Sequence, residues 1–129
     1  MKEMPLLLRE LRAPACMDRL SEDEWDLLLR QALASNLAAT LGLLAEEAGI
    51  SAALPARVRR RLAWSRTVWE RHLRAVAFEL RQIQKALRDT GLPLILLKGA
   101  AYTAAGLPAG GGRLFSDVDI LVPKERLAD

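Results

Sequence analysis

Residues 94–122 read LILLKGAAYTAAGLPAGGGRLFSDVDILV, and this stretch sets the topology of the C-terminal part of the chain. Its first apolar run, 93–97, lies between two glycines, which is typical of a short buried strand. The turn Lys98-Gly99-Ala100 then leads into a helix of small residues that ends near residue 105. A loop rich in glycine and proline follows over 106–112, and a second strand is expected at 117–122. The stretch therefore predicts a strand, a helix and a second strand.

The second strand carries two aspartates, Asp117 and Asp119, with one apolar residue between them. Because side chains alternate between the faces of a strand, both carboxylates are expected on one face, with Val118 and Ile120 on the other. Neighbouring carboxylate anions repel each other unless a cation or a shared proton relieves the repulsion. The pair is therefore a candidate metal site, and surface acids at the start of a strand are the alternative.

This stretch resembles the nucleotidyltransferase fold of the DNA polymerase beta superfamily, through LLKGAAY and the later GRLFSDVDILV. It is similar in particular to a bacterial group described as uncharacterised nucleotidyltransferase family proteins, which combine an LKGA-type turn with an R-x-x-S-D-[IV]-D-[IL]-L-V strand. The resemblance implies an α+β fold. A helical region over 1–91, with two long amphipathic helices, would precede the start (β-α-β) of a nucleotidyltransferase sheet over 92–129.

The resemblance also implies an activity, the transfer of a nucleoside monophosphate from an NTP, with Mg²⁺ or Mn²⁺ as the cofactor. Asp117 and Asp119 would be the catalytic metal ligands. The residues expected to bind the nucleotide lie in the turn and before the second strand: Lys98, Gly99, Ala100, Arg113 and Ser116. The acceptor stays open between RNA, a protein and a small molecule.

The turn is suited to phosphate because backbone N–H groups at a helix start bind anions, and because Gly99 permits close approach or a positive φ. Arg113 is a phosphate partner or a structural clamp on the loop. The glycine run 110–112 lacks the G-x-x-x-x-G-K-[ST] spacing of a phosphate loop. It is therefore predicted to be a flexible connector.

Two features depart from the superfamily pattern. Gly99-Ala100 stands where Gly-Ser is common, so a serine hydroxyl contact is missing. A third acidic residue on a later strand is expected beyond Asp129, so we expect the chain to be part of a larger protein or a truncated member, inactive alone. Two strands make a small sheet, whose exposed edges favour self-association.

The N-terminal part is expected to be helical, beginning with a short helix over 4–11. Ser21 and Glu24 have the spacing of a capping box. Apolar residues then recur at steps of three and four and predict one amphipathic helix over 21–48, which ends at Gly49.

Pro55 favours the start of a second long helix, expected over 56–89. Its apolar stripe includes Leu62, Leu80 and other residues at steps of three, four and seven. This stripe predicts packing on the preceding helix.

The second long helix is strongly basic. Pairing with the acidic first helix, together with a solvated face, is the favoured interpretation. The alternative is an anionic partner such as RNA, in a non-catalytic helical interaction or RNA-binding module with a remnant half-site. The spacing of Trp64 and Trp69 suits packing better than base stacking, and His72 is expected at the surface or its boundary.

Composition excludes several classes of protein. The formal net charge is only +3, so the overall charge does not by itself predict nucleic-acid binding. Cys16 is the one cysteine. A disulfide framework or cysteine-based zinc site is therefore excluded within one chain, which favours a cytoplasmic location. No apolar run in the sequence is long enough for a membrane span, so a membrane partner is not expected.

Overall fold

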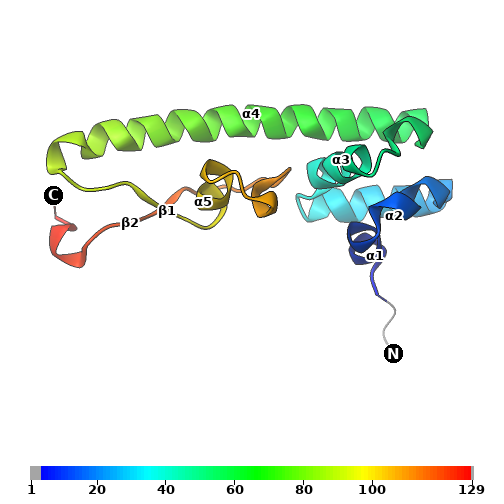
Figure 1. Cartoon of the computed structure of the whole chain (residues 1–129), viewed down its shortest axis with the longest axis horizontal. Helices are drawn as coiled ribbons and strands as arrows, with labels where there is room; N and C mark the ends of the chain where they lie inside the picture. The colour runs from blue at the N-terminus through cyan, green and yellow to red at the C-terminus, as the bar shows by residue number, and fades with distance from the viewer. Residues whose placement is uncertain (1–3, 129) are drawn as a thin grey trace.

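The computed structural model describes residues 4–128. Figure 1 shows one long helix, α4 (Ala56–Leu87), running the length of the molecule, with the shorter elements on one side of it. The other helices and strands are α1 (Leu6–Arg12), α2 (Glu22–Ala34), α3 (Ala38–Glu47), β1 (Ile95–Leu97), α5 (Lys98–Ala104) and β2 (Asp119–Leu121). Single 3₁₀ segments connect them at Pro14–Arg19, Ser51–Ala53, Arg88–Thr90, Pro108–Gly110 and Lys124–Arg126. Along α4, the helices α1–α3 lie at its N-terminal half, and α5 and the two strands lie at its C-terminal half (Figure 1).

The predicted long helix after Pro55 is confirmed. Its 32 residues correspond to roughly 48 Å at 1.5 Å per residue. The chain leaves the helix through the 3₁₀ turn Arg88–Thr90 and reaches Gly91, whose φ of +69° is left-handed. Glycine adopts this conformation without a Cβ clash, which explains why the helix ends there.

The prediction of one continuous helix over 21–48 is wrong. The chain breaks between α2 and α3 at Asn36, which has a φ of +56°. The N–H of Leu37 donates to the carbonyl of Ala32 at 2.8 Å, and that of Asn36 donates to Leu33 at 3.2 Å. This pattern is a Schellman C-cap with asparagine in the left-handed position. Apolar periodicity missed the break because it continues in α3.

The predicted capping box at the start of α2 is confirmed. The N–H of Glu24 donates to Ser21 Oγ at 3.2 Å, and the N–H of Ser21 donates to Glu24 Oε2 at 2.9 Å. These hydrogen bonds hold the pKa of the Glu24 carboxyl below its ordinary value, the backbone donor being the larger cause. The box thus satisfies two N–H groups that the first helical turn leaves unpaired.

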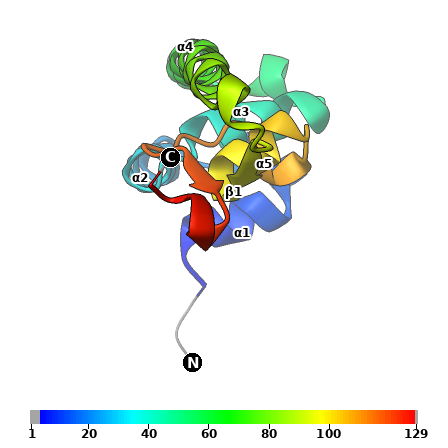
Figure 2. The ribbon, with the colours of Figure 1, turned by 90° about the vertical axis from the view of Figure 1, so that its left-hand side faces the viewer.

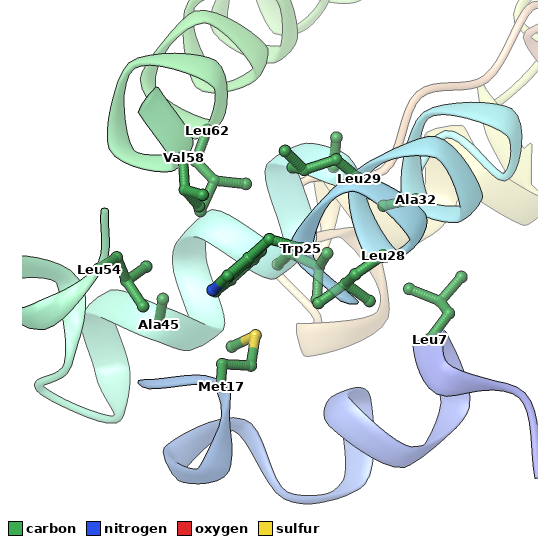
Figure 3. Packing of buried hydrophobic residues seen from close by; sticks show 12 residues of the cluster. Leu7, Met17, Trp25, Leu28, Leu29, Ala32, Ala45, Leu54, Val58 and Leu62 are labelled. Carbon is green, nitrogen blue, oxygen red and sulfur yellow. The ribbon is translucent and has the colours of Figure 1, made fainter. Parts of the chain in front are cut away.

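The hydrophobic core lies at one end of the molecule. Figure 3 shows Trp25 at its centre, with Met17 on one side and Val58 on another. The cluster joins α1, the 3₁₀ turn after it, α2, α3 and the first turns of α4. In the second half of α4 only Val76 is buried. The N-terminal part of the chain therefore has most of the buried apolar contacts.

This distribution predicts unequal effects along the α4 stripe. Leu62 is buried, and its replacement by alanine should lower the free energy of unfolding by about 2–5 kcal/mol. Leu80 is only half-buried, so Leu80→Ala should cost roughly 1 kcal/mol. Denaturant unfolding of both variants checks this, and equal losses would contradict a core confined to the N-terminal end of α4.

The two strands pair antiparallel in one small sheet, as the sequence predicts for their adjacency. Their register sets Leu96 opposite Ile120 and Leu97 opposite Asp119. The fold is therefore α+β with helices predominating. The second strand begins at Asp119, two residues later than predicted, so Asp117 lies just outside it. Among residues 4–128, no helix is both long and apolar enough to cross a membrane.

The glycine run after α5 is a packed joint, so the prediction of a flexible connector is wrong. Thr40 Oγ1 donates to the carbonyl of Gly111 at 3.0 Å. A Cβ on Gly112 would lie 2.3 Å from the backbone nitrogen of Thr40, and Gly112 has a φ of +72°. These glycines let the 106–112 loop lie directly on the first turn of α3, which fixes the segment that follows it.

Candidate functional site

A cleft of about 530 Å³ opens where the segment after the glycine loop passes the first turn of α5. It is lined by Asn36, Lys98, Gly99, Arg113, Leu114, Phe115, Ser116, Asp117 and Asp119. Both predicted metal ligands and four of the five predicted nucleotide-binding residues are therefore brought together. Ala100 is the exception, because it is fully buried in α5 and does not line the cleft. We call this hollow the carboxylate cleft.

Lys98 and Asp119 form an ion pair at the centre of this cleft. Lys98 Nζ lies 2.9 Å from Asp119 Oδ2, and the lysine side chain is 75% exposed. The hydrogen bond to Asp119, with the charge of Asp119 and then that of Asp117, raises the pKa of Lys98 above its ordinary value. The strand register explains the contact, because Leu97 lies opposite Asp119 and Lys98 follows at once. The ammonium group of Lys98 therefore interacts electrostatically with both carboxylates.

The turn at 98–99 has a different geometry from the predicted one. The positive φ is at Lys98, at +52°, rather than at Gly99. A lysine in this region is uncommon, and such strain is concentrated at functional sites. Gly99 serves close approach instead, because a Cβ there would lie 2.8 Å from the Phe115 ring. Phe115 is thereby set against the backbone that carries Lys98.

Phe115 in turn links the cleft to α4 through the only histidine of the chain. The rings of His72 and Phe115 meet edge to face, with centroids 4.5 Å apart and planes at 86°. Burial lowers the pKa of His72, since water is withdrawn from its charged form. His72 is therefore a half-buried packing residue, as the sequence indicated.

Arg113 contacts α5 across the loop. Its guanidinium carbon lies 5.7 Å from the centre of the Tyr102 ring, which is a cation–π contact. Its side chain also lines the carboxylate cleft. The clamp and phosphate-binding roles considered for Arg113 are thus compatible, because a stacked guanidinium keeps donors free on its edges.

The two carboxylates suit a divalent cation that shares its ligands with a substrate. Asp117 is exposed and Asp119 half-buried on the same cleft, and Lys98 pairs with Asp119 and so balances one of the two charges. Within the described residues 4–128, no group of three or more His, Cys, Asp or Glu side chains is placed to hold a metal. Mg²⁺ commonly takes one or two carboxylates and fills its remaining positions with water and substrate phosphates. The donor set therefore fits Mg²⁺ in the presence of a nucleotide.

Asn36 is a lining residue that sequence reasoning missed. It enters the cleft because the break between α2 and α3 turns the chain there. The signal was the Ser35-Asn36 pair within an apolar pattern, since asparagine tolerates left-handed backbone and often follows a helix end.

Comparison with family models matches residues 21–129 to the family described as "Uncharacterised nucleotidyltransferase". Comparison with curated proteins and with solved structures gives no match. The family match covers the whole of α2, α3 and α4 as well as the carboxylate cleft, and so extends far beyond the D-x-D strand. It agrees with the resemblance seen in the turn at Lys98 and in the strand at Asp119. The chain therefore belongs to this family of uncharacterised nucleotidyltransferases.

Proposed function

We propose that the carboxylate cleft binds an NTP with Mg²⁺ or Mn²⁺ and supports transfer of its nucleoside monophosphate to an acceptor hydroxyl. The observation that carries the proposal is the convergence of Asp117, Asp119, Lys98 and Arg113 on one cleft, since they come from both sides of the glycine loop. Carboxylates for a cation and cations for a triphosphate are the two needs of phosphoryl chemistry.

The chain's own residues have separate roles in this proposal. Asp117 and Asp119 hold the cation, and Asp119 exchanges Lys98 for it. Lys98 and Arg113 then bind phosphate oxygens, because both side chains are exposed and line the cleft. Ser116 offers a hydroxyl donor beside them. Gly99 lets the Phe115 ring pack against the first turn of α5.

The reaction balances as an in-line displacement at phosphorus. The acceptor oxygen forms a bond to the α-phosphorus, the bond to the bridging oxygen breaks, pyrophosphate leaves, and the hydroxyl proton passes to water. A bound divalent cation supplies charge stabilisation to the phosphate oxygens. The protein positions the triphosphate through Lys98 and Arg113.

A non-catalytic helical module with a remnant half-site is the second candidate. It is favoured by the Lys98–Asp119 pair, which neutralises one carboxylate without any metal. Metal-dependent NTP binding separates the two proposals, because a remnant site stabilised by Lys98 has no need of a cation.

Lys98→Ala gives opposite effects on metal and on nucleotide under the first proposal. Removing the ammonium group that occupies Asp119 should tighten binding of Mn²⁺ alone. Binding of Mg²⁺–NTP should weaken by roughly tenfold or more, because a charge-assisted hydrogen bond to phosphate is lost. Isothermal titration of Mn²⁺ and of Mg²⁺–NTP measures both. Lys85→Ala, an exposed lysine on α4, is the control for net charge. An unchanged Mg²⁺–NTP affinity in Lys98→Ala would contradict the role given to Lys98.

A further inference from the structure

Three neighbouring hollows lie between the first turn of α5 and a cluster of arginines on α4. The far hollow, here the arginine cleft, measures about 570 Å³ between α2 and the first turns of α4. Its lining residues are Asp26, Leu29, Arg30, Leu33, Arg57, Arg60, Arg61 and Trp64. In Figure 2, which views α4 end-on, α2 and α3 lie at different sides beneath α4.

A smaller hollow of about 100 Å³ joins the two clefts. It shares Leu33 and Trp64 with the arginine cleft. It shares Asn36 and Leu114 with the carboxylate cleft. The three hollows therefore adjoin one another, with Trp64 between the first two and Asn36 between the second two, and together we call them the groove.

The arginine cleft has an excess of positive charge. Four arginines and one aspartate, Asp26, line it. Arg57 Nη1 forms an ion pair with Asp26 Oδ1 at 2.7 Å. Arg30 Nε donates to the carbonyl of Asp26 at 3.3 Å. The side chains of Arg60 and Arg61 are exposed and have no hydrogen bond or ion pair within residues 4–128. The favoured interpretation of the basic helix is pairing together with a solvated face, and the pairs Arg57–Asp26 and Arg66–Glu46 agree with it. Arg60 and Arg61 are the exposed remainder, and they are concentrated in one cleft.

Trp64 is 59% exposed, so the prediction that it is a packing residue is wrong. It belongs to an α4 stripe at helical spacing with Arg57, Arg61 and Val68, beside the buried stripe of Val58 and Leu62. A large indole held open in a basic cleft offers a flat face to a ligand. Aromatic faces alternating with guanidinium groups are the arrangement that binds unpaired bases and their backbone.

We propose that this groove binds a single-stranded polynucleotide, with phosphates at Arg60 and Arg61, a base on Trp64, and one strand end at the carboxylate cleft. From Arg57, which lines the arginine cleft, to Val68, which lines the middle hollow, the axis of α4 advances roughly 16 Å. At 3.4 Å per stacked nucleotide this length corresponds to about five nucleotides. The claim that this strand is the acceptor for nucleotidyl transfer rests on the function proposed above. The claim that the groove binds the strand does not.

Binding is measured by anisotropy of labelled RNA and DNA oligonucleotides of roughly ten nucleotides, longer than the groove, in EDTA without NTP. Affinity should fall steeply with salt. Arg60→Ala/Arg61→Ala should lower the slope of log K against log salt by about 1.4, at ~0.7 per phosphate contact. The control Arg74→Ala/Arg81→Ala removes equal charge from exposed α4 positions outside the groove and should change the slope little.

Substitutions of Trp64 test base stacking, which the charge of the arginines does not affect. Trp64→Ala should weaken binding by roughly tenfold, while Trp64→Phe should retain most of it because a stacking face remains. Tryptophan fluorescence should be quenched on binding. Trp64→Phe should remove most of this quenching, because Trp25 is fully buried and Trp69 is half-buried and lines none of the three hollows. Binding of the RNA oligonucleotide alone, or of both the RNA and the DNA oligonucleotide, supports the proposal. The comparison also shows whether the protein recognises the 2′-hydroxyl.

Three results would overturn the proposal. They are no binding at low salt, equal losses in the groove and control arginine variants, and full binding in Trp64→Ala. Equal affinity for polyglutamate, insensitive to Trp64, would assign the cleft to acidic proteins instead. Mg²⁺–NTP titrations of the same variants keep the two proposals separate, because groove variants should leave nucleotide affinity unchanged.

Discussion

Gly112→Ala is expected to be among the most destabilising single-methyl changes in the chain. The added Cβ would lie 2.3 Å from the Thr40 nitrogen and 2.6 Å from its Cα, which are backbone atoms of α3 that have no rotamer to adopt. The φ of +72° adds the cost of left-handed backbone in a residue with a Cβ. Overpacking and backbone strain together should lower the free energy of unfolding by about 2–5 kcal/mol.

Gly106→Ala is the matched control. Gly106 has a similar φ of +64°, but a Cβ there meets nothing within 4 Å. It should therefore show the backbone term alone, about 1–2 kcal/mol. Denaturant unfolding of both variants separates the contact from the conformation. Equal losses at the two positions would contradict the packing of the glycine loop on α3.

The sequence predicted the elements whose signals are local. The capping box at Ser21, the long helix after Pro55 and the pairing of two short strands all follow from neighbouring residues or from simple periodicity. The same reasoning placed both aspartates and Lys98, since strand alternation and the turn before α5 need no distant contact. The structure has them on one cleft.

The features that were missed are ones that apolar periodicity and composition do not report. The break at Asn36 is a local helix cap, but the apolar pattern continues across it. The glycine run appeared flexible because composition alone does not show that Thr40 lies against Gly112. Trp64 has the spacing of a packing residue, yet its stripe faces the groove beside the core stripe. The contact of Thr40 with Gly112 joins residues far apart in the sequence, where periodicity carries no information.

Asp117→Asn and Asp119→Asn are expected to have the largest effect on function. Each substitution removes one ligand charge from the proposed cation site and keeps the size of the side chain. Because charge stabilisation by a metal amounts to several kcal/mol, nucleotidyl transfer should fall by about 10³-fold or more. Initial rates of transfer from a labelled NTP measure this loss in a form of the protein that also supplies the third carboxylate expected on a later strand. A rate unchanged by either substitution would contradict the assignment.

Stability should respond in the opposite sense. Without metal, the variants should unfold at the same temperature as the parent or slightly higher, because the repulsion between the carboxylates is relieved. Loss of the exposed Lys98–Asp119 pair should cost little, since such pairs contribute weakly. Asp89→Asn, an exposed aspartate distant in sequence from the cleft, is the control for charge. A large loss of stability without metal would indicate a structural pair.

The most direct measurement is calorimetric titration of Mg²⁺–NTP into the parent chain and into the double variant Asp117→Asn/Asp119→Asn, with a parallel titration of NTP in EDTA. The account predicts binding to the parent that depends on the divalent cation and is lost in the double variant. Equal binding of Mg²⁺–NTP by the parent and the double variant would contradict the carboxylate cleft as a metal–nucleotide site.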